Sequence, residues 1–373
     1  MLKINKRYWI LVGTIFAVWL ALVKPVEAEP WVNCQYYCLM DRTSGQVLLS
    51  NNGEKMRQVA STTKIMTAIL AEEYAGLEET AEVSEHADKT LEYTIGLRTG
   101  QKVMISELMK AALIRSANDA AVVLGEHVAG DEALFGHLMS LKAFAIGAAN
   151  THFCNASGLP AVNNYSTATD LAVIGRYALS HPYLQKMVGT AQIQFQHPGY
   201  RQPLTIRNTN GLLTSYAGAD GIKTGTTNAA GKCLVASASR NGRKLIAVVL
   251  NSADRQGDCQ RLLNYGFKNY SLGKIIDHQT PFKTIKVEHG NKPYVTILAK
   301  EDMWAWTDGK RPRLEKVVKM NYHIAAPVTK GQKVGELNVY SEGKLVKTIE
   351  LICGEDIGRE PGLLKKIYKH ILN

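Results

Sequence analysis

Proline is scarce in this sequence of 373 residues, and no single residue type dominates it. The chain has 11 prolines and 31 glycines, while 46% of its residues are hydrophobic and 21% are charged. This composition excludes a disordered, collagen-like or low-complexity protein. It fits a globular chain that is long enough for two domains.

Two signatures of binding proteins are also missing. The chain contains no Cys-x-x-Cys and no His-Glu-x-x-His, so we expect no dedicated metal site. A basic stripe is absent from its main part, because residues 29–272 carry 22 basic and 20 acidic residues. Residues 273–373 carry 18 and 12, so much of the excess charge lies towards the C-terminus. This distribution argues against a nucleic-acid partner.

Long apolar runs are missing everywhere except at the N-terminus. Three basic residues precede an apolar stretch at 8–23, and small or modest residues follow at 26–28. Residues 1–28 are therefore predicted to be a cleaved secretory signal. An uncleaved membrane anchor is the alternative, because the run is near the lower length limit for a spanning helix. Both readings place the rest of the chain outside the cytoplasm.

The six cysteines permit disulfides in an exported chain but do not require them. Cys34 and Cys38 would lie ~13 Å apart on one strand, which is too far for a bond between them. Cys38 and Cys233 stand in apolar strand patterns. We expect these two to be small buried hydrophobic residues.

Apolar periodicity predicts a mixed α/β region over residues 29–272. Strand patterns come first, helical patterns follow, and strand patterns return near the end. The predicted strands are 35–41, 45–50, 221–224, 232–238 and 244–250, and the predicted helices are 62–75, 105–114, 119–128 and 131–147. This order predicts one antiparallel sheet, shared by both ends of the region, with helices packed on it.

The pattern changes after about residue 272. Short alternating stretches separated by turn pairs predict a small all-β domain over residues 273–356. In the last segment, 357–373, apolar residues from Leu363 to Leu372 share one helix face with lysines beside it. This amphipathic tail is predicted to lie on an anionic membrane surface. Packing of the tail on the β domain is the alternative.

Ser61-Thr-Thr-Lys64 is the first candidate for chemistry. Residues i and i+3 of a helix face the same way, so Lys64 can take the proton that makes the Ser61 hydroxyl a nucleophile. The apolar residues that follow predict a buried, rigid helix. Ser271-Leu-Gly-Lys274 and Ser341-Glu-Gly-Lys344 have the same spacing, but we expect them to lie in turns. By spacing alone, Ser61 could also be a helix cap or a surface serine.

Two further motifs follow in the sequence. Ser116-Ala-Asn118 lies between two predicted helices, where both polar residues could be helix caps or could relay a proton and hold a substrate carbonyl. Asp220-Gly-Ile-Lys-Thr-Gly-Thr226 places a cation and a hydroxyl, Lys223 and Thr224, on a predicted strand with glycines beside them, or marks a strand end with a turn. Lysine and threonine together suit a carboxylate, and glycine allows a close backbone approach.

These three motifs, in this order, resemble those of the active-site serine penicillin-recognising enzymes. The blocks at 60–68, 115–121, 150–153, 165–168 and 220–225 resemble one branch, the exported D-alanyl-D-alanine carboxypeptidases or low-molecular-mass penicillin-binding proteins. The resemblance is close over about 30–270 and looser beyond. It implies a penicillin-binding/β-lactamase-like antiparallel sheet with packed helices, then a small all-β domain and an amphipathic C-terminal helix.

The resemblance also implies roles for these residues. Ser61 would be acylated, Lys64 would be its base, and Ser116 and Asn118 would assist proton transfer and substrate positioning. Burial and the nearby positive charge of Lys223 would lower the pKa of Lys64, as a base requires.

The same resemblance implies a carboxylate site and a substrate. Lys223 and Thr224 would bind the terminal carboxylate beside Gly225, and the N–H groups of Ser61 and Thr226 would form an oxyanion hole. The substrate would be a peptidoglycan stem peptide ending in D-Ala-D-Ala, β-lactams would acylate the enzyme, and no cofactor would be needed. The enzyme would act in the cell envelope, on the outer face of the cytoplasmic membrane. Arg255 is left outside this predicted site.

Two alternatives remain open at the level of sequence. A serine β-lactamase shares the three motifs, but this chain has Ser-Ala-Asn as its second motif and lacks a clear Glu-x-x-x-Asn between Ser116 and Lys223. A non-catalytic envelope scaffold could keep the fold, although Ser61 and Lys64 are intact. Covalent labelling by penicillin, and the lifetime of the label, would distinguish the three.

Overall fold

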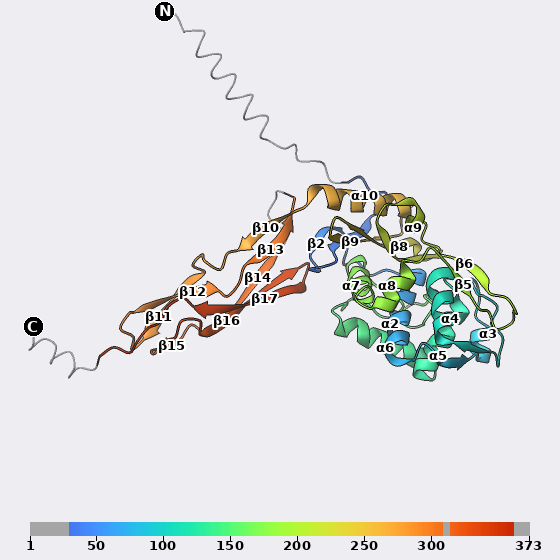
Figure 1. Cartoon of the computed structure of the whole chain (residues 1–373), viewed down its shortest axis with the longest axis horizontal. Coiled ribbons are helices and arrows are strands. Elements are labelled where there is room, and N and C mark those ends of the chain that lie inside the picture. Colours follow the sequence, from blue (N-terminus) through green and yellow to red (C-terminus); the bar gives the residue numbers. More distant parts are fainter. Residues whose placement is uncertain (1–29, 309–313, 362–373) are drawn as a thin grey trace, which may run out of the picture. The chain divides into compact units, whose positions relative to one another are not determined.

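The computed structural model describes residues 30–308 and 314–361, which are drawn in colour in Figure 1. The described residues from Trp31 onwards belong to one unit. The predicted signal at 1–28 and the predicted helix at 363–372 lie outside the described residues. Among the described residues, no helix is both long and apolar enough to cross a membrane.

A five-stranded antiparallel sheet forms the centre of the N-terminal region. Its strand order is β2-β1-β9-β8-β7. The strands are β1 (Tyr36–Asp41), β2 (Val47–Asn51), β7 (Ala219–Thr227), β8 (Gly231–Arg240) and β9 (Arg243–Leu250). The prediction that both ends of the region meet in one antiparallel sheet is confirmed.

Side chains alternate along each strand and so point to both faces of this sheet. Both faces are buried in hydrophobic cores. On β1, Cys38 and Met40 join one core while Leu39 joins the other. The first core is covered by helices α2 to α8, and the second by α10, on the opposite side of the strands in Figure 1. A shift of this sheet would therefore disrupt the packing of a hydrophobic core.

Four helices of this region, at 64–74, 105–110, 118–129 and 132–145, were predicted, and the five others among the described residues were not. The helices are α2 (Lys64–Tyr74), α3 (Glu85–Asp88), α4 (Ile105–Lys110), α5 (Asn118–Ala129), α6 (Glu132–Ala145), α7 (Ala168–Ala178), α8 (Pro182–Val188), α9 (Leu212–Ser215) and α10 (Arg255–Asn269). Two tight turns join them, the 3₁₀ turn η1 (Ala60–Thr63) and the π turn η2 (Ala111–Arg115). Two small two-stranded antiparallel sheets complete the region, β3 (Thr80–Glu82) with β4 (Lys102–Met104) and β5 (Gln192–Phe195) with β6 (Leu204–Arg207). Helix α10 was not predicted.

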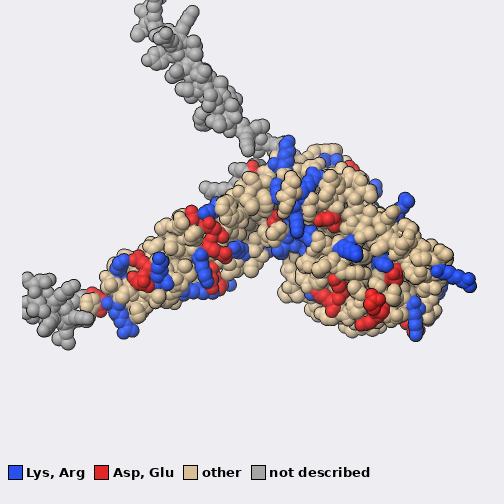
Figure 2. Space-filling view, in the orientation of Figure 1, with Lys and Arg blue, Asp and Glu red and all other residues tan. Residues whose placement is uncertain are grey.

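The C-terminal region is built from strands, as predicted. A six-stranded sheet has the order β14-β16-β17-β12-β11-β15, and β10 pairs with β13. The strands are β10 (Ser271–Ile276), β11 (Lys283–Glu288), β12 (Tyr294–Ala299), β13 (Met303–Thr307), β14 (Glu315–Met320), β15 (Ile324–Ala325), β16 (Lys333–Ser341) and β17 (Lys344–Cys353). Basic and acidic side chains are interspersed over the face drawn in Figure 2.

Some details differ from the sequence predictions. Ser271 and Lys274 lie on strand β10, so the expected turn at this Ser-x-x-Lys match is wrong. Ser341 and Lys344 do flank a turn, between β16 and β17. Ile357, which the sequence assigned to the tail, is buried in the β core and pairs with Val328.

The cysteines behave as the sequence indicated. All six carry free thiols, and Cys38 and Cys233 are fully buried. Burial raises the pKa of the Cys233 thiol to about 11, so this group stays protonated at neutral pH.

Leu262 tests how firmly α10 is attached to the sheet. Its side chain is 0% exposed, whereas Leu141 on α6 is 53% exposed. We expect Leu262→Ala to lower the free energy of unfolding by about 2–5 kcal/mol, because it leaves a cavity. The matched Leu141→Ala should change it by less than about 0.5 kcal/mol. Urea denaturation followed by circular dichroism measures both, and equal shifts would contradict the packing described.

Candidate active site

Ser61 lies in a strained turn directly before a buried helix. It is the second residue of η1, and the backbone continues into α2 at Lys64. Ala60, the preceding residue, has φ of +51°, a left-handed conformation that costs energy for any residue with a Cβ. Ser61 therefore precedes the α-helix instead of starting it, and the turn fixes where its hydroxyl points.

Lys64 is the most unusual residue of the site, because its side chain is completely buried. Its Nζ lies 3.0 Å from Ser61 Oγ, 2.6 Å from Asn118 Oδ1 and 2.6 Å from the carbonyl oxygen of Ser157. The first two contacts bring Lys64 together with Ser61 of its own motif and with Asn118 of the second motif. The third was not foreseen, because Ser157 belongs to no motif.

The surroundings of Lys64 disfavour its charged form. Burial, and then the positive charge of Lys223, lower the pKa of Lys64 well below its usual value. Asp119 and Glu132 act in the opposite direction but more weakly. A lysine amine that is neutral near physiological pH can act as a base.

Asn118 connects Lys64 to a neighbouring loop. It is the first residue of α5, where its Oδ1 faces Lys64 and its Nδ2 donates to the carbonyl of Glu92 at 3.0 Å. Ser116 lies two residues earlier with φ of +71° and is 9% exposed. Within the described residues its hydroxyl makes no hydrogen bond. The structure thus brings Asn118 into contact with Lys64, while Ser116 is held only by its backbone.

Strand β7 carries the third motif at the edge of the sheet. Lys223 and Thr224 are 1% and 4% exposed, and Thr224 Oγ1 lies 2.6 Å from Thr209 Oγ1. Burial, and then the charge of Arg255, lower the pKa of Lys223 to about 7. An anion bound beside Lys223 would raise this pKa again, because an opposite charge favours the protonated form of the amine.

Gly225 is where β7 and the serine turn come closest. A Cβ at this position would lie 2.8 Å from the carbonyl oxygen of Val59 and 2.9 Å from the backbone nitrogen of Ser61. Only glycine allows this approach. The strand and the turn can therefore offer their backbone N–H groups to the same small space.

Arg255 belongs to this group, although the sequence left it out. Its Nη1 donates to the carbonyl of Gly225 at 3.0 Å and to Thr226 Oγ1 at 2.8 Å. It begins α10, a helix that the apolar pattern did not reveal. The local signal was weak because the contact joins residues 30 positions apart.

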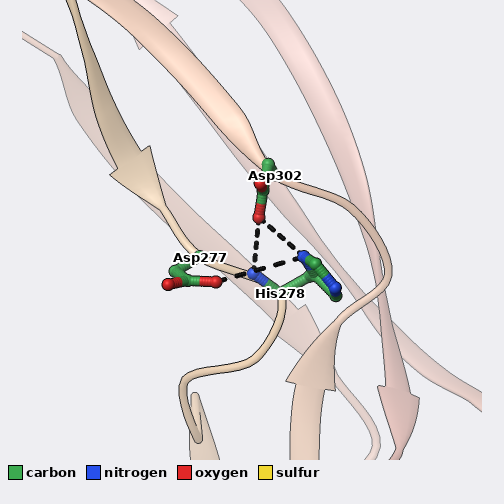
Figure 3. A group of neighbouring side chains, drawn as sticks. All are labelled: Asp277, His278 and Asp302. Carbon is green, nitrogen blue, oxygen red and sulfur yellow. Dashed lines mark hydrogen bonds and ion pairs between the residues drawn. The ribbon is translucent and has the colours of Figure 1, made fainter.

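One cluster elsewhere has the side chains of a metal site. Asp277, His278 and Asp302 have ligand atoms within 4.8 Å of one another (Figure 3). Asp302 accepts from His278 Nδ1 at 2.7 Å, and Lys274 Nζ lies 2.8 Å from the same carboxylate. These contacts already balance much of the carboxylate charge, so the cluster is explained as a surface ion-pair network of the β region.

Two family models match the chain. The model of D-alanyl-D-alanine carboxypeptidase, peptidase family S11, matches residues 24–254, and that of the penicillin-binding protein 5 C-terminal domain matches residues 270–359. The D-alanyl-D-alanine carboxypeptidase DacC of Escherichia coli is 32% identical over 94% of this chain and 90% of its own. DacF of Bacillus subtilis is 30% identical over 86% of this chain and 84% of its own.

Solved structures agree with these relatives. Penicillin-binding protein 5 of Haemophilus influenzae superposes with a TM-score of 0.69 at 28% identity, covering 89% of this chain and 100% of its own. DacD of Francisella tularensis gives 0.71 at 25% identity, covering 92% and 98%. The chain therefore belongs to the D-alanyl-D-alanine carboxypeptidase family S11 and is a serine peptidase.

Replacement of Gly225 tests the close approach of β7 to the serine turn. Gly225→Ala should push the backbone of Ser61 out of place and slow acylation by penicillin by about a hundredfold, the usual effect of losing one aligned backbone donor. Gly273→Ala is the control, because a Cβ there meets only Thr307 Cγ2, at 3.3 Å. Rates of labelling by fluorescent penicillin measure both, and an unimpaired Gly225→Ala would refute this geometry.

Proposed function

We propose that this protein removes the terminal D-alanine from peptidoglycan stem peptides ending in D-Ala-D-Ala, through an acyl-enzyme on Ser61. The observation that carries the proposal is the position of Lys64 Nζ, 3.0 Å from Ser61 Oγ and buried beside Lys223. A serine next to a neutral amine is an activated nucleophile.

The hydrogen bonds of Lys64 define its role as the base. When the amine is neutral, its two N–H groups can be donated to Asn118 Oδ1 and Ser157 O, both at 2.6 Å. The lone pair then faces Ser61 Oγ and takes its proton as the oxygen attacks the carbonyl carbon of the scissile peptide bond. Asn118 and the Ser157 carbonyl thus orient the base.

The negative charge of the tetrahedral intermediate needs donors that are already in place. The N–H groups of Ser61 and Thr226 lie on the two segments that meet at Gly225, and we assign them as the oxyanion hole. Collapse of the intermediate breaks the peptide bond, and the departing D-alanine nitrogen takes the proton from Lys64, directly or through the Ser116 hydroxyl. Water, activated by the same amine, then hydrolyses the ester and frees Ser61.

The terminal carboxylate of the substrate has its own partners. Lys223 supplies a buried positive charge and Thr224 a hydroxyl, both on β7. Arg255 adds a second cation whose Nη1 already contacts Gly225 and Thr226. Charge-assisted hydrogen bonds of this kind select substrates with a free C-terminus. β-Lactams carry a comparable carboxylate and would acylate Ser61 in the same way.

The remaining parts of the chain have proposed tasks in the cell envelope. Residues 1–28 would export the protein, residues 29–272 would do the chemistry, and residues 273–356 would support it as a β-rich domain. Residues 357–373 would associate with the outer face of the cytoplasmic membrane, through the apolar face and lysines of the predicted helix. Its first residues also complete the β region, since Ile357 is buried there.

Ser61→Ala tests the nucleophile. It should leave a folded protein that neither binds penicillin covalently nor releases D-alanine from a D-Ala-D-Ala peptide. Among the described residues, no other serine hydroxyl is hydrogen-bonded to a buried lysine amine. Ser271→Ala, at another Ser-x-x-Lys match, should behave like the parent. Mass spectrometry of penicillin-treated parent protein should map the adduct to Ser61. An adduct elsewhere would overturn the assignment, and an adduct lost within seconds would favour a serine β-lactamase.

The lowered pKa of Lys223 leads to a prediction of how carboxylate recognition depends on pH. Its pKa is lowered to about 7, so its charged form is lost as pH rises through that value. We expect the second-order rate constant for acylation by penicillin to fall above about pH 7, whereas the Lys223→Ala protein is slower and lacks this limb. Stopped-flow labelling between pH 5 and pH 9 would show it. A parent profile that stays flat to pH 9, or the same limb in Lys223→Ala, would contradict the role.

A further inference from the structure

The third Ser-x-x-Lys match of the sequence, Ser341 to Lys344, lies at the tip of a hairpin in the β region. Strands β16 and β17 are joined there by Glu342 and Gly343, both with positive φ. Ser341 is fully buried, and its Oγ accepts a hydrogen bond from the backbone N–H of Val47 at 2.9 Å. The tip therefore contacts the region that carries the active site, at strand β2.

Lys344, the last residue of the match, makes a second contact. Its Nζ lies 2.8 Å from Oδ1 of Asp170, in the first turn of α7. The Asp170 side chain is 0% exposed, and that of Lys344 is 18% exposed. Among the described residues, this ammonium is the only cation within ion-pair distance of the carboxylate. A buried carboxylate with a single cationic partner depends on that partner for its charge balance, because a buried charge without an opposite one is costly to keep out of water.

The other oxygen of Asp170 holds a segment that leads to the active site. Oδ2 accepts from the backbone N–H of Asn150 at 2.7 Å and from Thr151 Oγ1 at 2.8 Å. Six residues after Thr151 comes Ser157, whose carbonyl accepts from Lys64 Nζ at 2.6 Å. The segment is also held near its end, where the N–H of Ala156 donates to Glu132 Oε1 at 2.9 Å, so Asp170 is one of several anchors of this acceptor.

A second connection runs from Asp170 towards Ser61. Thr151 Oγ1 lies 2.8 Å from Ser166 Oγ, and Ser166 forms an antiparallel bridge with Arg57. The two backbone hydrogen bonds of that bridge are 2.8 and 2.9 Å long. Arg57 stands four residues before Ser61. Ser157, whose carbonyl orients Lys64, and Ser61 are thus both connected to the buried carboxylate of Asp170.

We propose that Lys344 is a positioning residue, through which the β hairpin holds Asp170 and the segments that place Ser157 O and Ser61. It touches neither substrate nor Lys64. The proposal rests on the proposed function for its kinetic consequence, but the contact itself can be measured without any activity. It assigns the β region a task in catalysis although that region supplies no reacting group.

Four variants of the full chain separate this role from a general loss of stability. Lys344→Met removes the charge and keeps the length of the side chain, and Lys344→Arg keeps the charge. Lys344→Met combined with Asp170→Asn removes both charges. Lys347→Met is the matched control, because Lys347 is on the same strand and pairs with Glu301 at 3.1 Å inside the β region.

The kinetic measurement is acylation by fluorescent penicillin, at a temperature where circular dichroism shows every variant folded. Lys344→Met should lower the first-order acylation rate at saturating penicillin by about tenfold or more, because small displacements of the base are costly. The concentration for half-saturation should change by less than about twofold, since the carboxylate site is untouched. Lys344→Arg and the double variant should recover most of the rate, and Lys347→Met should match the parent.

Hydrogen exchange of the Asn150 amide tests the contact independently. This N–H is donated to Asp170, so its exchange should accelerate in Lys344→Met and return towards the parent rate in Lys344→Arg. Unchanged exchange in Lys344→Met would overturn the proposal, as would an unchanged acylation rate or an equal loss in Lys347→Met. A parent protein that penicillin does not acylate would instead refute the proposed function, and the exchange data would still decide the role of Lys344.

Discussion

The buried amine of Lys64 is the constraint on which the rest of the structure depends. Removing a lysine from water favours its neutral form, and the charge of Lys223 adds to this effect. The amine must still be hydrogen-bonded, or the interior could not hold it. Its three oxygen partners come from Ser61, Asn118 and Ser157, which lie on three separate segments. The fold can therefore be understood as the means by which these segments are brought to one point.

Several segments that form the active site carry a local conformation that an unconstrained chain would avoid. Ala60 and Ser116 have left-handed backbones, and Gly225 allows a contact that a Cβ would block. Such positions persist only where the surrounding packing determines them. The central sheet supplies that packing, because both of its faces are buried in hydrophobic cores. The packing of these two cores therefore stabilises the strained backbone conformations of the active site.

The sequence predicted the site well where chemistry is local and poorly where it is not. Ser61 and Lys64 are three residues apart on one turn, so their spacing alone brings them together. Arg255 reaches β7 from a helix that opens with polar residues and whose apolar stripe, which begins only at Cys259, the sequence analysis did not recognise. The Ser157 carbonyl belongs to the backbone, which no side-chain motif records. Lys344 and Asp170 are 174 positions apart, and only folding reveals that they pair.

The central claim is that Lys64 is neutral at the pH at which the protein works. A nitrogen-detected NMR titration of isotope-labelled lysine side chains measures this directly, with Lys64 assigned by its absence from the spectrum of Lys64→Met. The account predicts that Lys64 loses its proton well below the usual value of 10.5. A Lys64 signal that stays charged up to about pH 10, alongside the surface lysines, would contradict it.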